Sequence, residues 1–208
     1  MSLQKKPLGK SGLEIAPLVF GGNVFGWTAD DNRSFQLLDR FVEQGFSAID
    51  TADVSSAWAP GLEGGESEAV IGRWLKKRGR RDDVILMSKV GMLERRKGLS
   101  AANIEAAIED SLSRLGTDYL DVYFAHIDDQ EVPLEETLAA FDRLIKAGKV
   151  RSIGASNYSS DRLEQALAVS HDHGFTRYEL IQPLYNLHGR ADFESSLAKV
   201  ASKCSFDI

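Results

Sequence analysis

Short runs of β-branched and aliphatic residues alternate along the chain with longer stretches whose apolar residues recur at helical spacing. Gly, Pro, Asn or Asp marks each change from one pattern to the other. This alternation is typical of consecutive βα units. The predicted strands cover residues 17–21, 46–50, 84–89, 119–125, 150–155 and 178–182. The predicted helices run from 30 or 31 to 44, and over 66–78, 100–115, 134–147, 160–173 and 193–203.

Six βα units predict an α/β fold of the parallel (β/α) TIM-type barrel class. The barrel is incomplete in this chain, because eight units in roughly 250 residues close one. Residues 13–17 add half of a small N-terminal β-hairpin. Right-handed crossovers place the first and sixth strands at opposite edges of the sheet, and such open edges favour self-association. A doubly wound sheet is the alternative, but residues 21–26 do not match its G-x-G-x-x-G fingerprint.

Composition narrows the class of protein and of partner. The 208 residues are 43% hydrophobic, which is enough for one core, so a single domain over residues 1–208 is expected. The net charge of -6 is spread along the chain, which argues against nucleic acid or an anionic membrane as a partner. One cysteine cannot form an internal disulfide, and no apolar stretch follows the N-terminal charges. We therefore expect a cytoplasmic protein that binds small molecules and has no metal site.

Polar side chains end four of the predicted strands. Asp50 ends the second, Lys89 the third and His126 the fourth, while Ser156 and Asn157 follow the fifth. In a parallel barrel the carboxyl ends of the strands share one mouth, so these side chains should meet there. A carboxylate, an ammonium and an imidazole in one mouth can handle protons.

Several segments in fixed order make the chain resemble the aldo-keto reductase family. They are residues 45–53 (GFSAIDTAD), 65–68 (GESE) with 71–72 (IG), 87–89 (MSK), 111–121 (SLSRLGTDYLD), 148–157 (GKVRSIGASN) and 182–186 (QPLYN). The resemblance implies a reductase of aldehydes or ketones that takes a hydride from NADPH and a proton from a tyrosine hydroxyl. It implies that Asp50 and Lys89 tune that tyrosine and that His126 orients the carbonyl.

The same resemblance implies that Ser156, Asn157 and Gln182 hold the nicotinamide carboxamide. Gly22 and Asn23, in the Gly-rich turn after the first strand, are candidate cofactor contacts together with Asp50, and a plain tight βα turn is the alternative for the glycine pair. Trp27 and Trp58 are candidate walls of the substrate pocket.

The chain departs from the family pattern at Ser55, which stands where the family has its catalytic tyrosine. A serine hydroxyl is less acidic than a phenol of pKa ~10, and it is shorter. Tyr123 is no substitute, because strand alternation turns it away from the mouth. The segments that hold the pyrophosphate and 2′-phosphate in the family are also not visible before Ile208. We therefore expect an impaired reductase, and the alternative is a non-catalytic nucleotide- or ligand-binding protein on the same scaffold.

Overall fold

The computed structural model describes residues 3–204 and 206, and it has the predicted α/β architecture. Within these residues, six parallel strands form one curled sheet in the order β3-β4-β5-β6-β7-β8. The strands are β3 (Val19–Gly21), β4 (Ala48–Asp50), β5 (Ile85–Val90), β6 (Leu120–Ala125), β7 (Val150–Ser156) and β8 (Leu180–Gln182). The first and sixth predicted strands, β3 and β8, lie at opposite edges as expected, so the sheet is half of a barrel.

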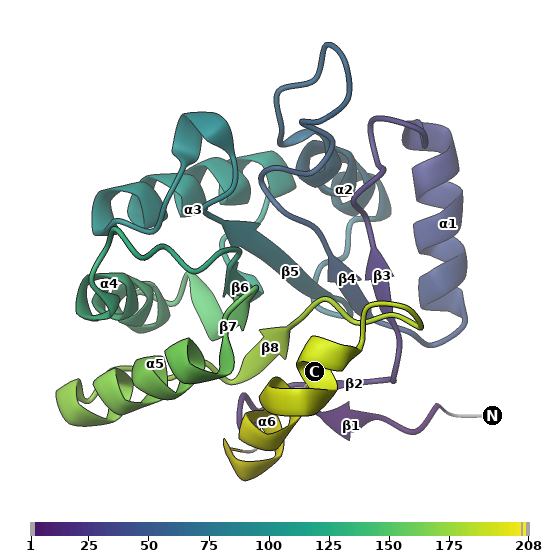
Figure 1. The fold of residues 1–208 in the computed structure, drawn as a ribbon. Helices are drawn as coiled ribbons and strands as arrows, with labels where there is room; N and C mark the ends of the chain where they lie inside the picture. Colours follow the sequence, from purple (N-terminus) through teal and green to yellow (C-terminus); the bar gives the residue numbers. More distant parts are fainter. Residues whose placement is uncertain (1–2, 205, 207–208) are drawn as a thin grey trace.

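Helices α1 to α5 lie around the outer side of the curled sheet (Figure 1). They are α1 (Asp31–Glu43), α2 (Glu66–Arg78), α3 (Ala101–Leu115), α4 (Leu134–Lys146) and α5 (Ser160–His173). The side chains of Asp30 and Ser100 accept hydrogen bonds from backbone amides of α1 and α3, so polar caps begin these helices where the sequence predicts them. The predicted helix 193–203 begins with a wider π turn, η2 (Phe193–Leu197), before α6 (Ala198–Cys204). A short 3₁₀ helix after β5, η1 (Glu94–Arg96), is not predicted by the sequence pattern.

The N-terminal hairpin joins β1 (Lys6–Pro7) to β2 (Glu14–Ile15) in antiparallel pairing. Its residues Leu8, Leu13 and Ile15 pack with apolar side chains of the inner face of the sheet. Among these partners are Met87, Val122 and Phe124. The hairpin therefore covers an apolar part of the inner face.

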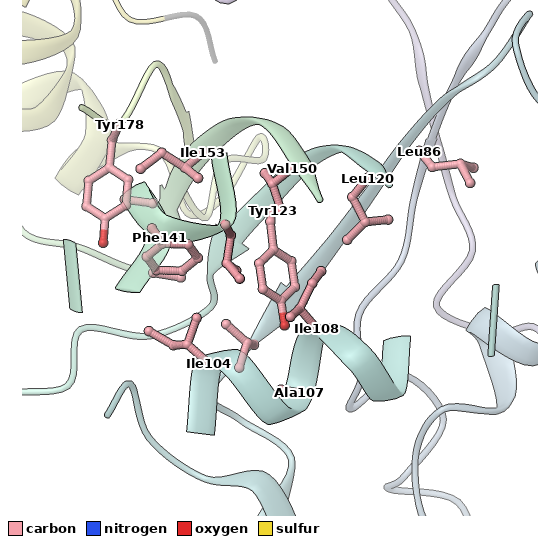
Figure 2. Close-up of a cluster of buried hydrophobic side chains, with 14 of the residues drawn as sticks. Leu86, Ile104, Ala107, Ile108, Leu120, Tyr123, Phe141, Val150, Ile153 and Tyr178 are labelled. Carbon is pink, nitrogen blue, oxygen red and sulfur yellow. The ribbon is translucent and has the colours of Figure 1, made fainter. Parts of the chain in front are cut away.

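The main core lies between the outer face of the sheet and the helices (Figure 2). Successive side chains of a strand point to opposite faces. Along β6, Tyr123 joins the sheet–helix core, whereas its neighbours Val122 and Phe124 belong to the inner cluster. In Figure 2 Tyr123 lies beside Ile108 of α3. Tyr123 therefore points away from the mouth, as strand alternation predicts.

Within the described residues, no helix is both long and apolar enough to cross a membrane.

Candidate active site

Asp50 and Lys89 form a buried ion pair at the carboxyl ends of the neighbouring strands β4 and β5. The Nζ atom of Lys89 lies 2.7 and 2.6 Å from the two carboxylate oxygens of Asp50. It also donates to the backbone oxygen of Thr51, at 2.8 Å. These three contacts can occupy the three N–H donors of an ammonium group. Lys89 is only 4% exposed, so this lysine is buried next to Asp50.

His126 follows β6 directly and reaches the same mouth. Its backbone amide donates to the Val90 oxygen at 2.9 Å, which extends the pairing between β5 and β6 by one residue. Burial and, second, the charge of Lys89 lower the pKa of His126 to about 4. The imidazole is therefore neutral near pH 7, with one N–H donor and one acceptor nitrogen. Its Nδ1 atom is buried and has no hydrogen-bond partner among the described residues.

The ends of β7 and β8 bring Ser156, Asn157 and Gln182 together. The Ser156 hydroxyl donates to the Gln182 backbone oxygen at 2.8 Å. The Asn157 amide nitrogen donates to the His126 oxygen at 2.8 Å and to the Ser156 hydroxyl at 3.2 Å. Asn157 has a positive φ of 60°, a conformation that asparagine tolerates better than most residues. The three predicted carboxamide ligands therefore lie together, joined by a hydrogen bond to the His126 backbone.

The backbone of Gly22 is engaged within the protein. Its amide donates to the Asp50 oxygen at 2.8 Å, and its carbonyl accepts from the Ser67 hydroxyl at 2.7 Å. A methyl group at Gly22 would lie 3.2 Å from the ring of Phe25 and 3.3 Å from the Asp50 oxygen, so this turn fits closely against β4. Asn23 is exposed beside it. The structure gives Gly22 a part in holding the first turn, and its cofactor contact stays a prediction.

Ser55 lies in the loop between β4 and α2, which covers residues 51–65 and is called the β4–α2 loop below. Ser55 is 3% exposed, and its amide donates to the Ala52 oxygen in a tight turn. The next residue, Ser56, has a φ of 74°, and its hydroxyl donates to the Phe25 oxygen at 2.9 Å. In the part of the chain that the structure describes, no hydrogen bond joins Ser55 to Asp50, Lys89 or His126. Ser55 is therefore not connected to the charged pair.

Trp27 and Trp58 contact each other edge to face, with ring centroids 6.0 Å apart. They are 47% and 53% exposed. Trp58, Met92 and other residues of the loops after β4 and β5 line a hollow of about 630 Å³. This volume falls within the range of small-molecule pockets. The two predicted pocket residues thus form one aromatic pair, with Trp58 at the edge of this hollow.

Behind the β4–α2 loop lies a buried group of charges that the sequence did not single out. Glu68 of α2 is fully buried and pairs with Arg114 of α3, with Nε 2.6 Å from Oε2. Its other oxygen accepts from the Ser88 hydroxyl of β5 at 2.5 Å. Asp53 is 1% exposed and lies in the same group. One signal was present: Glu68 is three, four and seven residues before Ile71, Gly72 and Leu75, on the buried face of the helix.

This chain is similar to several known proteins, and each match covers nearly all of this chain but only part of the other protein. Aldo-keto reductase YhdN from Bacillus subtilis is 36% identical over 191 residues, which cover 90% of this chain and 54% of that protein. Protein tas from Escherichia coli is 32% identical over 216 residues, covering 92% of this chain and 62% of that protein. Norsolorinic acid reductase stcV from Emericella nidulans is 31% identical over 204 residues, covering 90% of this chain and 51% of that protein. The chain thus spans between 51% and 62% of the length of these three relatives.

The family model described as the aldo/keto reductase family matches residues 17–208, from the first barrel strand onward. The same residues contain every strand end at which the candidate side chains lie. The half-barrel and the family match agree, and the chain belongs to the aldo/keto reductase family.

Proposed function

We propose that the function of this chain is that of an NADP(H)-dependent oxidoreductase that reduces aldehydes or ketones to alcohols, with activity lowered by Ser55. One observation carries this proposal: the Asp50–Lys89 pair and the neutral His126 lie at the ends of three adjacent parallel strands. Relatives named as an aldo-keto reductase and a norsolorinic acid reductase support it.

The residues at the ends of β7 and β8 suit a nicotinamide carboxamide. That group offers one carbonyl acceptor and one amide donor. Asn157 uses its side-chain nitrogen within the protein, so its side-chain oxygen stays able to accept. The side chain of Gln182 makes no hydrogen bond to another described residue and can donate or accept. Asn157 and Gln182 would hold the carboxamide, and the bound cofactor would supply the hydride.

On the substrate side, His126 would donate a hydrogen bond to the carbonyl oxygen, and Ser55 would place a hydroxyl that is only weakly acidic at the position of the family's tyrosine. A neutral imidazole can donate one hydrogen bond to a carbonyl oxygen, and the low pKa of His126 keeps it neutral over the physiological range. The hydrogen bonds of Lys89 are all directed to Asp50 and Thr51. Ser55 therefore has no ammonium hydrogen-bonded to it that would make its hydroxyl more acidic. Since a general acid contributes typically about 10²–10⁴-fold, a slow reductase is expected.

The direct test is NADPH oxidation with a panel of aldehydes and ketones, followed by the loss of nicotinamide absorbance. Ser55→Tyr is compared with Ser55→Phe, because the two variants differ only by a phenol hydroxyl. We expect Ser55→Tyr to raise the turnover rate by roughly 10²-fold or more over the wild type, and Ser55→Phe not to raise it. If both variants fold and bind NADPH but neither turns over any carbonyl, the catalytic assignment of position 55 is wrong, and the reductase proposal fails with it.

A non-catalytic binding protein is the second candidate, and Ser55 is the observation that favours it. Titration of NADPH against tryptophan fluorescence separates the two, because the exposed pair Trp27 and Trp58 lies on the loops after β3 and β4. Saturable binding by the wild type, with no turnover even in Ser55→Tyr, would favour the binding protein. Turnover restored by tyrosine would favour the reductase.

A further inference from the structure

Asp53 is a buried carboxyl group that forms no ion pair with another described residue. It lies in the β4–α2 loop, two residues before Ser55, and is 1% exposed. Among the described residues no side chain donates a hydrogen bond to its carboxyl oxygens, and the neighbouring Val54 amide is only a minor influence that favours the ionised form. An ionised carboxylate in such a place is costly unless it is paired, so buried acids of this kind become neutral.

The positive charges around Asp53 neutralise the carboxylate of Glu68 but not that of Asp53 as well. Glu68 faces it from α2, Arg114 from α3, Tyr123 from β6 and Arg95 from the segment after β5. Arg114 is already paired with Glu68, at 2.6 Å. Arg95 donates to the backbone oxygens of residues 63 and 64, at 2.7 and 3.2 Å. The guanidinium of Arg114 is therefore bonded to Glu68, and no cation of the described residues forms an ion pair with Asp53.

The backbone around Asp53 leaves little room for the side chain to turn outward. Its amide donates to the Lys89 oxygen at 3.3 Å. Gly64, with a φ of +93°, packs so closely that a methyl group there would lie 2.7 Å from the backbone oxygen of Asp53. A methyl group at Gly65 would lie 2.6 Å from Cδ of Arg114. Asp53 can therefore reach water only if the loop moves, and Ser55 and Trp58 lie on that loop between Asp53 and Gly64.

We propose that Asp53 is held as a neutral acid and acts as a proton-dependent latch of the β4–α2 loop. Loss of its proton favours an open loop in which the carboxylate reaches water, and Ser55 and Trp58 move with it. In support, burial and then the charge of Glu68 raise the pKa of Asp53 to about 7, while Arg114 opposes the rise. In the open loop the acid would have its ordinary pKa of 3.8. The inference does not depend on the reductase proposal, because it concerns the protein without cofactor or substrate.

Hydrogen exchange of residues 51–65, measured by mass spectrometry and corrected for the intrinsic effect of pH, tests the latch. The population of the open loop should rise up to about tenfold for each pH unit between about pH 4 and pH 7, and level off above. Protection of the loop should fall in the same proportion. Asp53→Asn replaces the acid with a group of the same shape that does not titrate. The hydrogen-exchange protection of the loop in this variant should therefore not change with pH. Asp82→Asn, which neutralises an exposed acid on another loop, should behave like the wild type.

Two results would overturn the latch. The first is that Asp53→Asn shows the same pH dependence of loop protection as the wild type. The second needs no variant: infrared spectra of the wild type at pH 6 should contain the C=O band of one protonated carboxyl group, and its absence would show that Asp53 is ionised. Because this second measurement uses the unaltered chain, the proposal stays testable even if Asp53→Asn fails to fold.

Discussion

The pKa values of the half-buried His126 and the buried Asp53 are shifted in opposite directions, and together they predict an unusual pH dependence of stability. The pKa of His126 falls from 6.5 to about 4 on folding, so the unfolded chain takes up a proton as the pH drops below 6.5 and the folded protein does not. Stability is therefore lost as the pH falls. The pKa of Asp53 rises from 3.8 to about 7, so stability is lost as the pH rises through this interval. Between about pH 4.5 and 6.5 the two effects oppose each other.

Asp53→Asn removes one of these effects and leaves the other. A difference of one bound proton between the folded and unfolded states changes the free energy of unfolding by about 1.4 kcal/mol per pH unit. Because the effects of His126 and Asp53 have opposite signs, the free energy of unfolding of the wild type should change little over this interval on account of these two groups. In the variant only the His126 effect remains, and the free energy of unfolding should rise by about 2 kcal/mol from pH 4.5 to 6.5. At pH 4.5 both proteins carry a neutral group at position 53 and should be similarly stable. Above pH 7 the variant should be more stable, by up to about 4 kcal/mol.

Urea unfolding, followed by circular dichroism at half-unit steps from pH 4.5 to 7.5, measures these curves. Asp82→Asn serves as the control, because its side chain is 81% exposed and its removal should leave the wild-type curve unchanged in shape. If the curves of wild type and Asp53→Asn run parallel, Asp53 does not keep its proton in the folded protein. The reasoning for both the latch and the stability would then be refuted.

Three further outcomes follow from the packing, all measurable on purified protein. Arg114→Met should lower the free energy of unfolding by roughly 3–5 kcal/mol, because it leaves the buried Glu68 unpaired. Adding Glu68→Gln should restore much of that loss, and an equal loss in the single and the double variant would contradict this. Gly72→Ala should destabilise by roughly 1–3 kcal/mol despite the helix preference of alanine, because the methyl group would lie 2.2 Å from the Arg114 oxygen, and a gain in melting temperature would disprove this contact. The edge strands β3 and β8 should favour self-association, so sedimentation should depend on protein concentration, and Val19→Lys on the β3 edge should reduce that dependence.

Local sequence signals were enough for the order of the elements and for the strand-end residues. The caps Asp30 and Ser100 bond the amides at the start of their helices, because a helix leaves its first amides unpaired wherever it begins. Asp50 and Lys89 meet because parallel neighbours end at the same edge of a sheet. These outcomes depend on short-range pattern and on the direction of the strands, and both can be predicted from the residues alone.

The tertiary structure decided which charges share one space. Glu68, Asp53 and Arg114 are far apart in the chain, and only the packing of α2 and α3 against the sheet brings them together. The same is true of Lys89, whose three hydrogen bonds go to Asp50 and Thr51 and leave Ser55 aside. A pKa depends on burial and on neighbouring charges, which no spacing along the chain specifies. The sequence by itself determined the half-barrel and its strand-end chemistry, whereas the burial of Asp53, two residues before Ser55, depends on the packing of the helices against the sheet.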